Sequence, residues 1–382
     1  MKKICYCTTI PATLNAFVSK SAIYIHEHTD WDISFICDYD PEFASSLPEY
    51  IHYYPVHMER GISLGGVKAM FEIKKIFKRE RFDMVQYSTP NAALYASLAS
   101  WLTGIPNRLY CQWGLVYIGF SGIKRGILKL EEKLVCALST WIEPDSHSNL
   151  DFAHAEGLYP QEKGAVIWNG SACGIDFKKF DVTKKQEYQE KIRAKYNIKN
   201  ENFVFGFIGR ITRDKGINEL LQAFQQLSEK NEQIRLMIVG PEELDNTVDQ
   251  ELYLWSKKNE AIIYTGYTNV AEQYLSAMDT YILPSYREGF GMGVIEAEAM
   301  GVPVIVSNIP GPIDAMLNGR TGVVVKKADT QSLYEAMKQM LEKPQLRAEF
   351  SLAGERFARE NFDQTILFEH ILEDRKRLLR AD

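Results

Sequence analysis

Positive charge and glycine occur together in one short segment in the second half of the chain. Arg210 and Lys215 supply two cations, and Gly209 and Gly216 stand at its two ends. The segment follows an apolar run and precedes a helical pattern, a position where α/β sheets bind ligands because helix N-termini there offer unpaired N–H groups. Cations at that edge suit a leaving group that gains negative charge, such as a diphosphate. A solvated loop with a helix cap is the alternative interpretation.

Two carboxylates and three glycines form a second cluster. Glu288 and Glu296 stand eight positions apart, and Gly289, Gly291 and Gly293 lie between them. Glycines near a helix start are costly unless the backbone must approach something closely. A carboxylate can accept two hydrogen bonds from a vicinal diol, as in a ribose or a sugar ring. Alternatively, Glu288 is a surface charge and Glu296 an exposed helix position.

Short apolar runs alternate with helical patterns along most of the chain, which predicts parallel β-sheets covered by helices on both faces. Strands are expected at 3–7, 33–37, 83–87, 107–111, 165–168, 203–208, 234–239, 261–265, 280–283, 302–306 and 322–325. A chain of 382 residues exceeds what one hydrophobic core usually serves. We therefore expect domains at 1–180 and 181–360, and a final helical segment, 361–382, that packs back on the first domain.

Composition excludes several classes of protein. The net charge of −6 argues against a nucleic-acid binder, which needs a broad basic face. Six irregularly spaced cysteines predict core thiols in a reducing compartment, not a metal site. The N-terminus leads directly into a strand and not a signal peptide, and no run approaches the ~20 apolar residues needed to cross a bilayer. We expect a cytoplasmic protein.

Together these motifs resemble glycosyltransferase family 4, whose members are retaining enzymes of GT-B architecture. The resemblance rests on the segment 209–216, on the Glu-x7-Glu spacing of Glu288 and Glu296, and on the stretches 298–304, 311 and 318–322. It covers nearly the whole second half. It implies two Rossmann-like domains whose parallel sheets face each other across a cleft, with the C-terminal helix crossing back to the first domain.

The resemblance also implies roles for single residues. Residues matching Arg210 and Lys215 hold the donor diphosphate, the residue matching Glu288 lies by the transferred sugar, and the one matching Glu296 binds the ribose. Arg210, Lys215 and Glu288 are therefore the expected catalytic set. The expected donor site comprises Gly209, Arg210, Lys215, Tyr267, Glu288, Gly289, Phe290, Gly291 and Glu296. Tyr267 enters it as a candidate for the base pocket, and the three residues 289–291 enter through their main-chain groups.

The first half is less similar to the family. Its opening, residues 8–15, lacks the Gly-Gly phosphate loop common there, so Thr9, Ala12 and Thr13 are the candidates for an acceptor-side loop. Many members carry a histidine near the reacting centre, but the comparable stretch here, 111–114, reads Cys-Gln-Trp-Gly. The resemblance therefore assigns no catalytic histidine to this sequence. His147 is a candidate for the acceptor side only.

Two further stretches narrow the resemblance to one branch of the family. Residues 8–11 (Thr-Thr-Ile-Pro) and 168–176 (Trp-Asn-Gly-Ser-Ala-Cys-Gly-Ile-Asp) are similar to the branch that builds capsule and O-antigen repeat units. Acceptors of that branch are usually polyprenyl-diphosphate-linked sugars. The donor is expected to be a UDP-sugar, which is a substrate and not a cofactor.

Metal-like signals have simpler explanations. Asp38-Tyr39-Asp40 imitates an Asp-x-Asp metal motif, but the following Pro41 favours a turn. His26-Glu27-His28 lacks the spacing of a zinc helix. Since the family neutralises the leaving diphosphate with Arg, Lys and helix N-termini, no metal is expected.

A basic region in the first half suggests a membrane partner. Residues 60–81 contain two acidic residues and seven basic ones, namely Arg60, Lys68, Lys74, Lys75, Lys78, Arg79 and Arg81. Residues 120–128 add further apolar and basic side chains. A core-facing helix with a solvated back explains part of this pattern. The excess of positive charge also suits an anionic bilayer, so we expect peripheral contact with the inner face of the cytoplasmic membrane.

The sequence therefore predicts a metal-independent, retaining glycosyltransferase that moves a hexose or N-acetylhexosamine from a UDP-sugar to a glycan in capsule, O-antigen or related polysaccharide synthesis. The second domain would hold the donor and the first domain the acceptor. A nucleotide-sugar epimerase or hydrolase of the same architecture, or a non-catalytic sugar-binding subunit, is the alternative.

Overall fold

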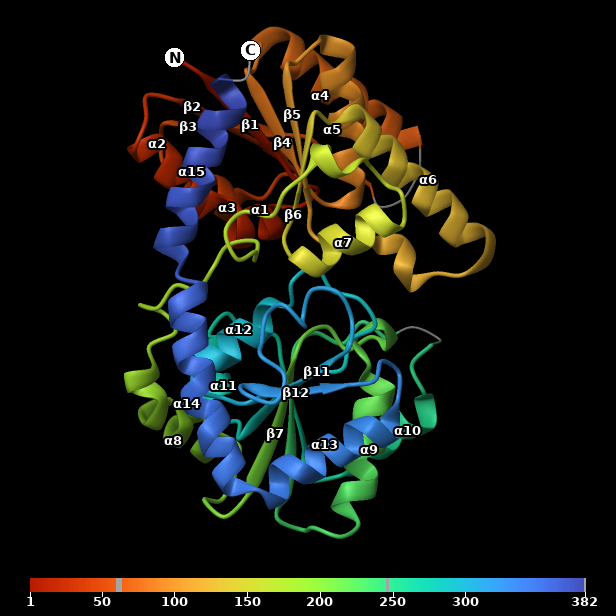
Figure 1. Ribbon diagram of the computed structural model, residues 1–382, viewed down its shortest axis with the longest axis vertical. Coiled ribbons are helices and arrows are strands. Elements are labelled where there is room, and N and C mark those ends of the chain that lie inside the picture. Colours follow the sequence, from red (N-terminus) through yellow and green to blue (C-terminus); the bar gives the residue numbers. More distant parts are fainter. Residues whose placement is uncertain (60–63, 245–246, 381–382) are drawn as a thin grey trace. The chain divides into compact units, whose positions relative to one another are not determined.

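The computed structural model describes residues 1–59, 64–244 and 247–380, and Figure 1 traces its helices and strands. The chain divides into two compact units. Unit 1 comprises Met1–Cys173 together with Thr365–Asp382, and unit 2 comprises Gly174–Gln364. Arg60, counted above among the basic residues, lies outside the described residues. Within the described ranges, no helix is both long enough and apolar enough to cross a bilayer.

Unit 1 is built on a six-stranded parallel sheet with the strand order β3-β2-β1-β4-β5-β6. Its strands are β1 (Lys3–Cys7), β2 (Asp32–Cys37), β3 (Ile51–Pro55), β4 (Met84–Tyr87), β5 (Asn107–Gln112) and β6 (Trp141–Pro144). β1 pairs with β2 on one side and β4 on the other and is buried on both faces, which explains its non-alternating sequence. The predictions for β1, β2, β4 and β5 are confirmed, whereas β3 and β6 were missed.

The strand expected at 165–168 is wrong. Gly164 forms only an isolated bridge with Ile142 of β6, and the chain then leaves the ladder. Trp168 instead stacks on His370 of the last helix, with the ring centroids 5.6 Å apart. Trp168 therefore packs on the last helix, and the stretch does not extend the sheet.

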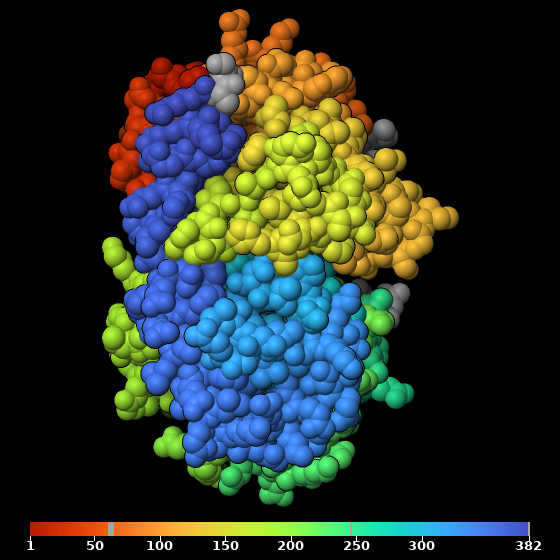
Figure 2. Space-filling model, viewed as in Figure 1, coloured from red at the N-terminus to blue at the C-terminus, as the bar shows by residue number. Residues whose placement is uncertain are grey.

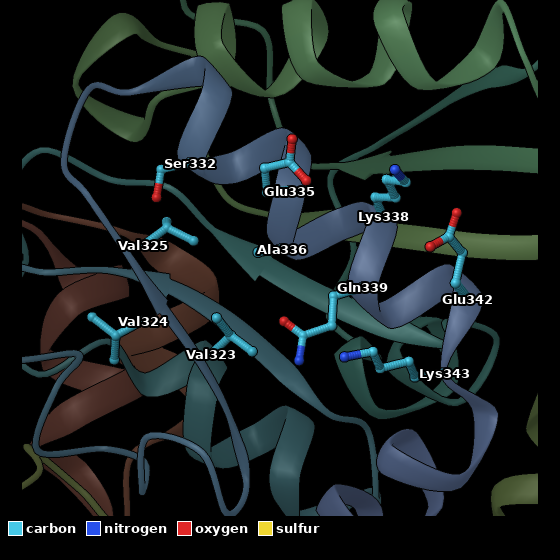
Figure 3. A pocket seen from close by; sticks show the side chains of 10 residues that line it. All are labelled: Val323, Val324, Val325, Ser332, Glu335, Ala336, Lys338, Gln339, Glu342 and Lys343. Carbon is cyan, nitrogen blue, oxygen red and sulfur yellow. The ribbon is translucent and has the colours of Figure 1, made fainter.

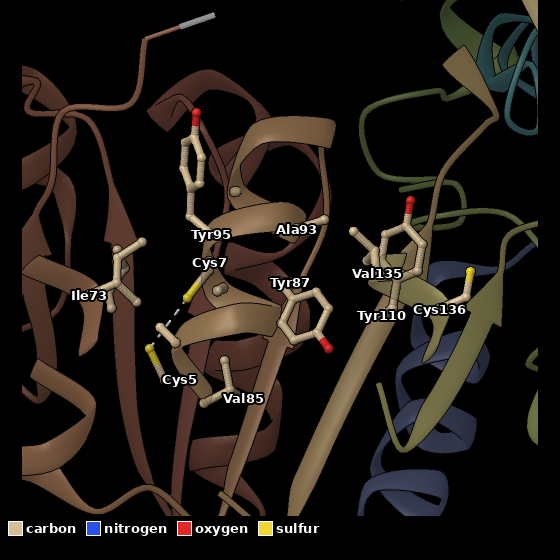
Figure 4. Packing of buried hydrophobic residues seen from close by; sticks show 14 of the residues in the cluster. Cys5, Cys7, Ile73, Val85, Tyr87, Ala93, Tyr95, Tyr110, Val135 and Cys136 are labelled. Carbon is tan, nitrogen blue, oxygen red and sulfur yellow. Dashed lines mark hydrogen bonds between the residues drawn. The ribbon is translucent and has the colours of Figure 1, made fainter. Parts of the chain in front are cut away.

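Helices cover both faces of this sheet. One face carries α4, α5 and α6, and their shared core is seen in Figure 4, where the sulfur atoms of Cys5 and Cys7 lie 3.8 Å apart. The other face carries α1, α2, α3 and α15. The helices of unit 1 are α1 (Pro11–Phe17), α2 (Ser19–Glu27), α3 (Pro41–Ser46), α4 (Leu64–Glu80), α5 (Pro90–Thr103), α6 (Gly122–Leu138), α7 (His147–Ala155) and α15 (Gln364–Arg380).

A buried arginine ties α15 to the sheet of unit 1. The guanidinium of Arg375 donates to both carboxylate oxygens of Glu143 on β6, at 2.6 and 3.1 Å, and to the side-chain oxygen of Gln86 on β4 at 3.1 Å. Arg375 is 1% exposed. The last helix of the chain is therefore part of the fold of unit 1.

Unit 2 repeats the architecture with a parallel sheet of order β12-β11-β10-β7-β8-β9. Its strands are β7 (Phe203–Ile208), β8 (Ile234–Val239), β9 (Ile262–Gly266), β10 (Thr280–Leu283), β11 (Val304–Ser307) and β12 (Gly322–Val325). Each was predicted from the sequence, with small differences at the ends. Its helices are α8 (Lys185–Lys195), α9 (Ile217–Ser228), α10 (Gln250–Lys258), α11 (Ala271–Ser276), α12 (Met292–Ala299), α13 (Thr330–Glu342) and α14 (Pro344–Asn361). The prediction of two α/β units with parallel sheets is confirmed.

Candidate active site

The two clusters found in the sequence follow neighbouring strands of unit 2. The basic segment joins β7 to α9, and the carboxylate segment joins β10 to α12. Because β7 and β10 pair in parallel, their carboxyl ends meet at one edge of the sheet. This is the edge at which α/β sheets bind ligands.

Lys215 and Glu288 join the two loops directly. The ammonium group of Lys215 donates to a carboxylate oxygen of Glu288 at 2.6 Å, and the hydroxyl of Ser285 donates to the same oxygen at 2.7 Å. The side chains of the ion pair are 19% and 13% exposed. The pair is therefore screened less by water than a surface pair and holds both groups in place.

Glycine is required where these loops touch. Gly216 has φ of +74°, and a Cβ there would lie 2.1 Å from the carbonyl oxygen of Pro284. On the other side of the contact, the backbone N–H of Tyr286 donates to the carbonyl of Asp214 at 2.8 Å. The first loop thus packs against the second without an intervening side chain.

Asp214 adds a charged link between the loops. A carboxylate oxygen of Asp214 lies 2.8 Å from a guanidinium nitrogen of Arg287, and the hydroxyl of Thr212 donates to the other oxygen at 2.5 Å. Burial raises the pKa of Asp214, but the Thr212 hydrogen bond and the positive charge of Arg287 outweigh it and hold the pKa below its usual value. The Asp214 carboxylate therefore has a structural role, because it holds the two loops together through Arg287.

Arg210 lies on the same loop but does not join the Lys215–Glu288 pair. Its guanidinium pairs with Glu243 at 2.9 Å, and both side chains are 44% exposed. A surface pair of this kind contributes little energy, so Arg210 can exchange Glu243 for an anionic ligand at small cost. Of the four side chains singled out in the sequence, Arg210 is the most accessible to solvent.

Glu296 lies on α12 and is partly buried. Burial raises its pKa to about 7, the positive charge of Lys179 lowers it and the negative charge of Glu272 raises it. The electrostatic effect of the two carboxylates also acts on Tyr281 of β10. Burial raises the pKa of Tyr281 well above its usual value, and the negative charges of Glu288 and Glu296 raise it further. Both carboxylates of the Glu-x7-Glu spacing thus belong to the segment that follows β10, Glu288 in the loop and Glu296 on α12.

Lys179 and Glu272 were missed by the sequence interpretation. The Lys179 ammonium group lies 3.8 Å from a carboxylate oxygen of Glu272 and donates to the carbonyl of Asn269 at 3.1 Å. Glu272 is 5% exposed. Lys179 lies one residue before the expected end of the first domain at 180, and no local pattern distinguished it from a solvated lysine.

Phe290 contributes to the core and not to a ligand surface. Its ring is 2% exposed and packs edge-on against Phe362, with the centroids 5.3 Å apart. Gly291, with φ of +89°, is the N-cap residue of α12. Gly311 packs closely against the backbone of this loop, since a Cβ there would lie 2.0 Å from the Gly289 carbonyl oxygen. Only the main chain of 289–291 is left to contact a ligand.

Two donor-side candidates remain, Tyr267 and Gly209. Tyr267 directly follows β9, the edge strand, and is 78% exposed. Gly209 begins the first loop, where its N–H donates to the carbonyl of Val239 at 2.9 Å. Its backbone is thereby tied to the neighbouring strand β8.

In unit 1, Thr9 lies in the loop that follows the central strand β1. Its N–H and its hydroxyl bond to the hydroxyl of Thr89 at 3.0 and 2.8 Å, which joins the loops after β1 and β4. Ala12 and Thr13 lie in the first turn of α1, with Ala12 exposed, and His147 is the exposed first residue of α7. The N–H of Thr9 already has a protein partner, so this loop does not present it to a phosphate.

Asp40 and Asp38 have structural partners. Asp40 caps α3 by accepting from the N–H of Phe43 at 2.7 Å, and Pro41 is the first residue of this helix and not part of the expected turn. Asp38 accepts from the N–H of Tyr39 at 2.9 Å and pairs with the ring of His57 at 2.9 Å.

A groove of about 400 Å³ in unit 2 lies apart from these loops. Figure 3 shows its lining by β12 and α13, with Glu335, Lys338 and Gln339 among the side chains. The exposed edge of β12 is capped nearby, because the N–H of Val324 donates to the side chain of Asn318 and that of Lys326 to Ser332. The groove contains none of the predicted site residues.

Two family descriptions match the chain. Residues 188–357 match glycosyl transferases group 1, a span that includes both loops of the candidate site. Residues 3–140 match glycosyl transferase 4-like proteins.

The relatives and the fold agree with this match. The capsular polysaccharide biosynthesis glycosyltransferase CapM of Staphylococcus aureus is 31% identical over 335 residues, 87% of this chain and 84% of that protein. The UDP-Gal:alpha-D-GlcNAc-diphosphoundecaprenol alpha-1,3-galactosyltransferase of Escherichia coli is 25% identical over 329 residues, 84% and 82% of the two chains. Anabaena Alr3699/HepE, solved in complex with UDP and glucose, is 19% identical with a TM-score of 0.79 over 99% of this chain and 100% of that one. The chain therefore belongs to the group 1 glycosyltransferases, with the GT-B fold, and is an enzyme of sugar transfer.

Proposed function

We propose that the chain is a retaining enzyme that moves a hexose or N-acetylhexosamine from a UDP-sugar to a polyprenyl-diphosphate-linked glycan, in the synthesis of capsule, O-antigen or a related surface polysaccharide. The observation that carries the donor part is the Lys215–Glu288 ion pair, which joins two strand-to-helix loops beside Glu296. The acceptor part is supported by the E. coli relative, whose name specifies UDP-galactose and a diphosphoundecaprenol-linked sugar.

The donor diphosphate would bind at the loop that carries Arg210 and Lys215. Arg210 would leave its exposed pair with Glu243, and Lys215 would share its charge between Glu288 and a phosphate oxygen. The main-chain groups of 289–291, next to the N-terminus of α12, would contact sugar and phosphate. Glu296 would accept hydrogen bonds from the ribose hydroxyls.

Transfer would proceed on one face of the sugar. The bond between the anomeric carbon and the phosphate oxygen breaks, and a bond from that carbon to the acceptor hydroxyl oxygen forms on the same face. The acceptor proton passes to the departing phosphate oxygen. Arg210 and Lys215 would stabilise the negative charge that the diphosphate gains, so the proposal needs no metal ion.

The acceptor would bind to unit 1, and the protein would work at the inner face of the cytoplasmic membrane. The basic helix α4 supports this placement, because Lys68, Lys75, Lys78 and Arg79 are exposed on it. Each basic residue near an anionic surface contributes about 1 kcal/mol.

A transfer assay tests the proposal. UDP- and GDP-sugars would first be screened for thermal stabilisation, which reports binding by mass action. The stabilising donors would then be incubated with and without a polyprenyl-diphosphate-linked monosaccharide, and the anomeric configuration of the product would be read by NMR. We expect UDP release that depends on acceptor, and a product that keeps the donor configuration. UDP release or a changed sugar without acceptor would identify a hydrolase or an epimerase instead.

A further inference from the structure

Helix α6 of unit 1 exposes a continuous apolar stripe. Ile123, Ile127, Leu130 and Leu134 are 84%, 54%, 70% and 42% exposed. They follow one another at intervals of four, three and four residues, which places them on one face of a helix with 3.6 residues per turn. Figure 2 shows α6 projecting from the right-hand side of unit 1, in gold.

The core of unit 1 does not account for this stripe. Val135 and Cys136 are buried in the core beneath α5, and Leu128 packs against the same cluster, so these residues form the inward side of α6. The exposed stripe lies on the other side and makes the helix apolar on two faces. Contiguous apolar surface of this kind marks an interaction site, whereas single exposed apolar residues such as Leu254 on α10 are ordinary.

The charges around the stripe favour an anionic partner. Lys124 and Lys133 flank it on either side, with the half-buried Glu131 beside Lys124. The ammonium group of Lys124 lies 4.0 Å from the centre of the Phe120 ring, which places a cation next to another apolar side chain. Basic side chains at the border of an apolar stripe are the arrangement that settles in lipid headgroups.

Helix α4 extends this positive surface. It covers the same face of the sheet as α6, with α5 between them (Figure 1). The two helices together contain nine basic and four acidic residues, although the whole chain has a net charge of −6. α4 also exposes Val67 and Phe71, at 50% and 51%.

We propose that α6 is the membrane-inserting element of this protein. The stripe Ile123–Ile127–Leu130–Leu134 lies in the boundary between headgroups and acyl chains of an anionic bilayer, with the helix axis parallel to the surface. Lys124, Lys133 and the basic residues of α4 contact the headgroups. This inference rests on the proposed function in one respect, because a lipid-linked acceptor lies in the bilayer and the enzyme must bind there to reach it.

Vesicle sedimentation tests the insertion. The probes are vesicles of phosphatidylglycerol and phosphatidylcholine in equal parts, and vesicles of phosphatidylcholine alone. We expect the full chain to bind the anionic vesicles, and the double variant Ile127→Asn/Leu130→Asn to bind at least tenfold more weakly. The matched control Leu254→Asn/Leu352→Asn changes two exposed leucines of unit 2 and should leave binding unchanged. Circular dichroism and melting temperature check that each variant is folded.

Several outcomes would overturn the inference. One is no binding of the wild-type chain to anionic vesicles, and another is equal binding by the α6 variant. A third is a wild-type dimer in sedimentation velocity that the α6 variant converts to a monomer, because the stripe would then contact a second copy.

A separate readout distinguishes this inference from the proposed function. The α6 variant should transfer sugar normally to a water-soluble, short-chain acceptor and poorly to the same acceptor in vesicles. If the wild-type chain binds vesicles but transfers no sugar from any donor, the proposed function is wrong and the insertion of α6 stands.

Discussion

The ammonium group of Lys215 lies 2.6 Å from the carboxylate of Glu288, across 73 positions of sequence. Each residue follows a different strand, and the two strands are neighbours in the sheet of unit 2. The pair brings the cation expected at the leaving group next to the carboxylate expected at the sugar. A mostly buried ion pair keeps both groups oriented before any ligand arrives.

Lys215→Ala should lower the rate of transfer by about 10²–10³, the loss expected when one charge-stabilising donor is removed. Lys215→Arg should restore part of the rate, because it keeps the charge in a different shape. The measurement is kcat with a saturating donor, and melting temperature checks the fold because Glu288 loses its partner. Near-normal turnover in Lys215→Ala would remove Lys215 from the diphosphate site.

Donor affinity should strengthen as pH rises from 6 to 8. Burial is the main reason that the pKa of Glu296 lies at about 7, with Glu272 raising it and Lys179 lowering it. The ionised carboxylate is the better acceptor for ribose hydroxyls, so binding should improve as the group loses its proton. Calorimetric titration with UDP at several pH values measures this, and Glu296→Gln should flatten the profile. An unchanged profile in Glu296→Gln would assign the pH dependence to another group.

The same shift should act on stability with the opposite sign. The pKa of Glu296 is higher in the folded protein than its ordinary value of 4.5. Between these two pH values the folded state therefore holds a proton that the unfolded state has lost. The contribution of Glu296 to stability is present below about pH 4.5 and is lost as pH rises through 7. In the ligand-free protein, Glu296→Gln should be more stable relative to wild type at pH 8 than at pH 5. Thermal unfolding at the two pH values gives this difference, and a difference of reversed sign would contradict the assignment.

Gly216→Ala should destabilise unit 2 more than Gly319→Ala does. Both glycines have positive φ, +74° and +73°, which costs alanine about 1–2 kcal/mol. Gly319 has open space around its Cβ position, whereas a Cβ at Gly216 would lie 2.1 Å from the Pro284 oxygen. The difference in free energy of unfolding between the two variants measures the contact between the loops. Weaker UDP binding should accompany Gly216→Ala alone, and equal effects of the two changes would show that the contact is not required.

Arg375→Gln should destabilise unit 1 by about 3–5 kcal/mol, because it leaves Glu143 buried without its charged partner. The double variant Glu143→Gln/Arg375→Gln should be less affected than the single variant, since it removes both charges. Calorimetry measures the loss of stability of unit 1, and limited proteolysis measures the exposure of α15. UDP binding by unit 2 serves as the internal control. Additive losses in the double variant would show that the two side chains do not act as a pair.

The sequence alone was sufficient where the signal is local. The apolar run at 203–208 has no alternation, as a strand buried on both faces requires, and it became the central strand β7. The segments that begin at Gly209 and at Glu288 were recognised from glycine, charge and their position between strand and helix. Local patterns failed at 165–168, where Trp168 packs on α15, and at β3 and β6, which lie at the two edges of their sheet.

Contacts between distant segments were decided only by the tertiary structure. The order of the strands places Lys215 beside Glu288 and Arg210 beside Glu243. It also places Lys179 and Glu272 near Glu296. No local spacing in the sequence encodes that order. The apolar periodicity of α6 is written in its sequence, but a period alone does not say which face reaches the core. That choice depends on what packs against the helix, because a side chain is buried by its neighbours in space and not by its neighbours in sequence.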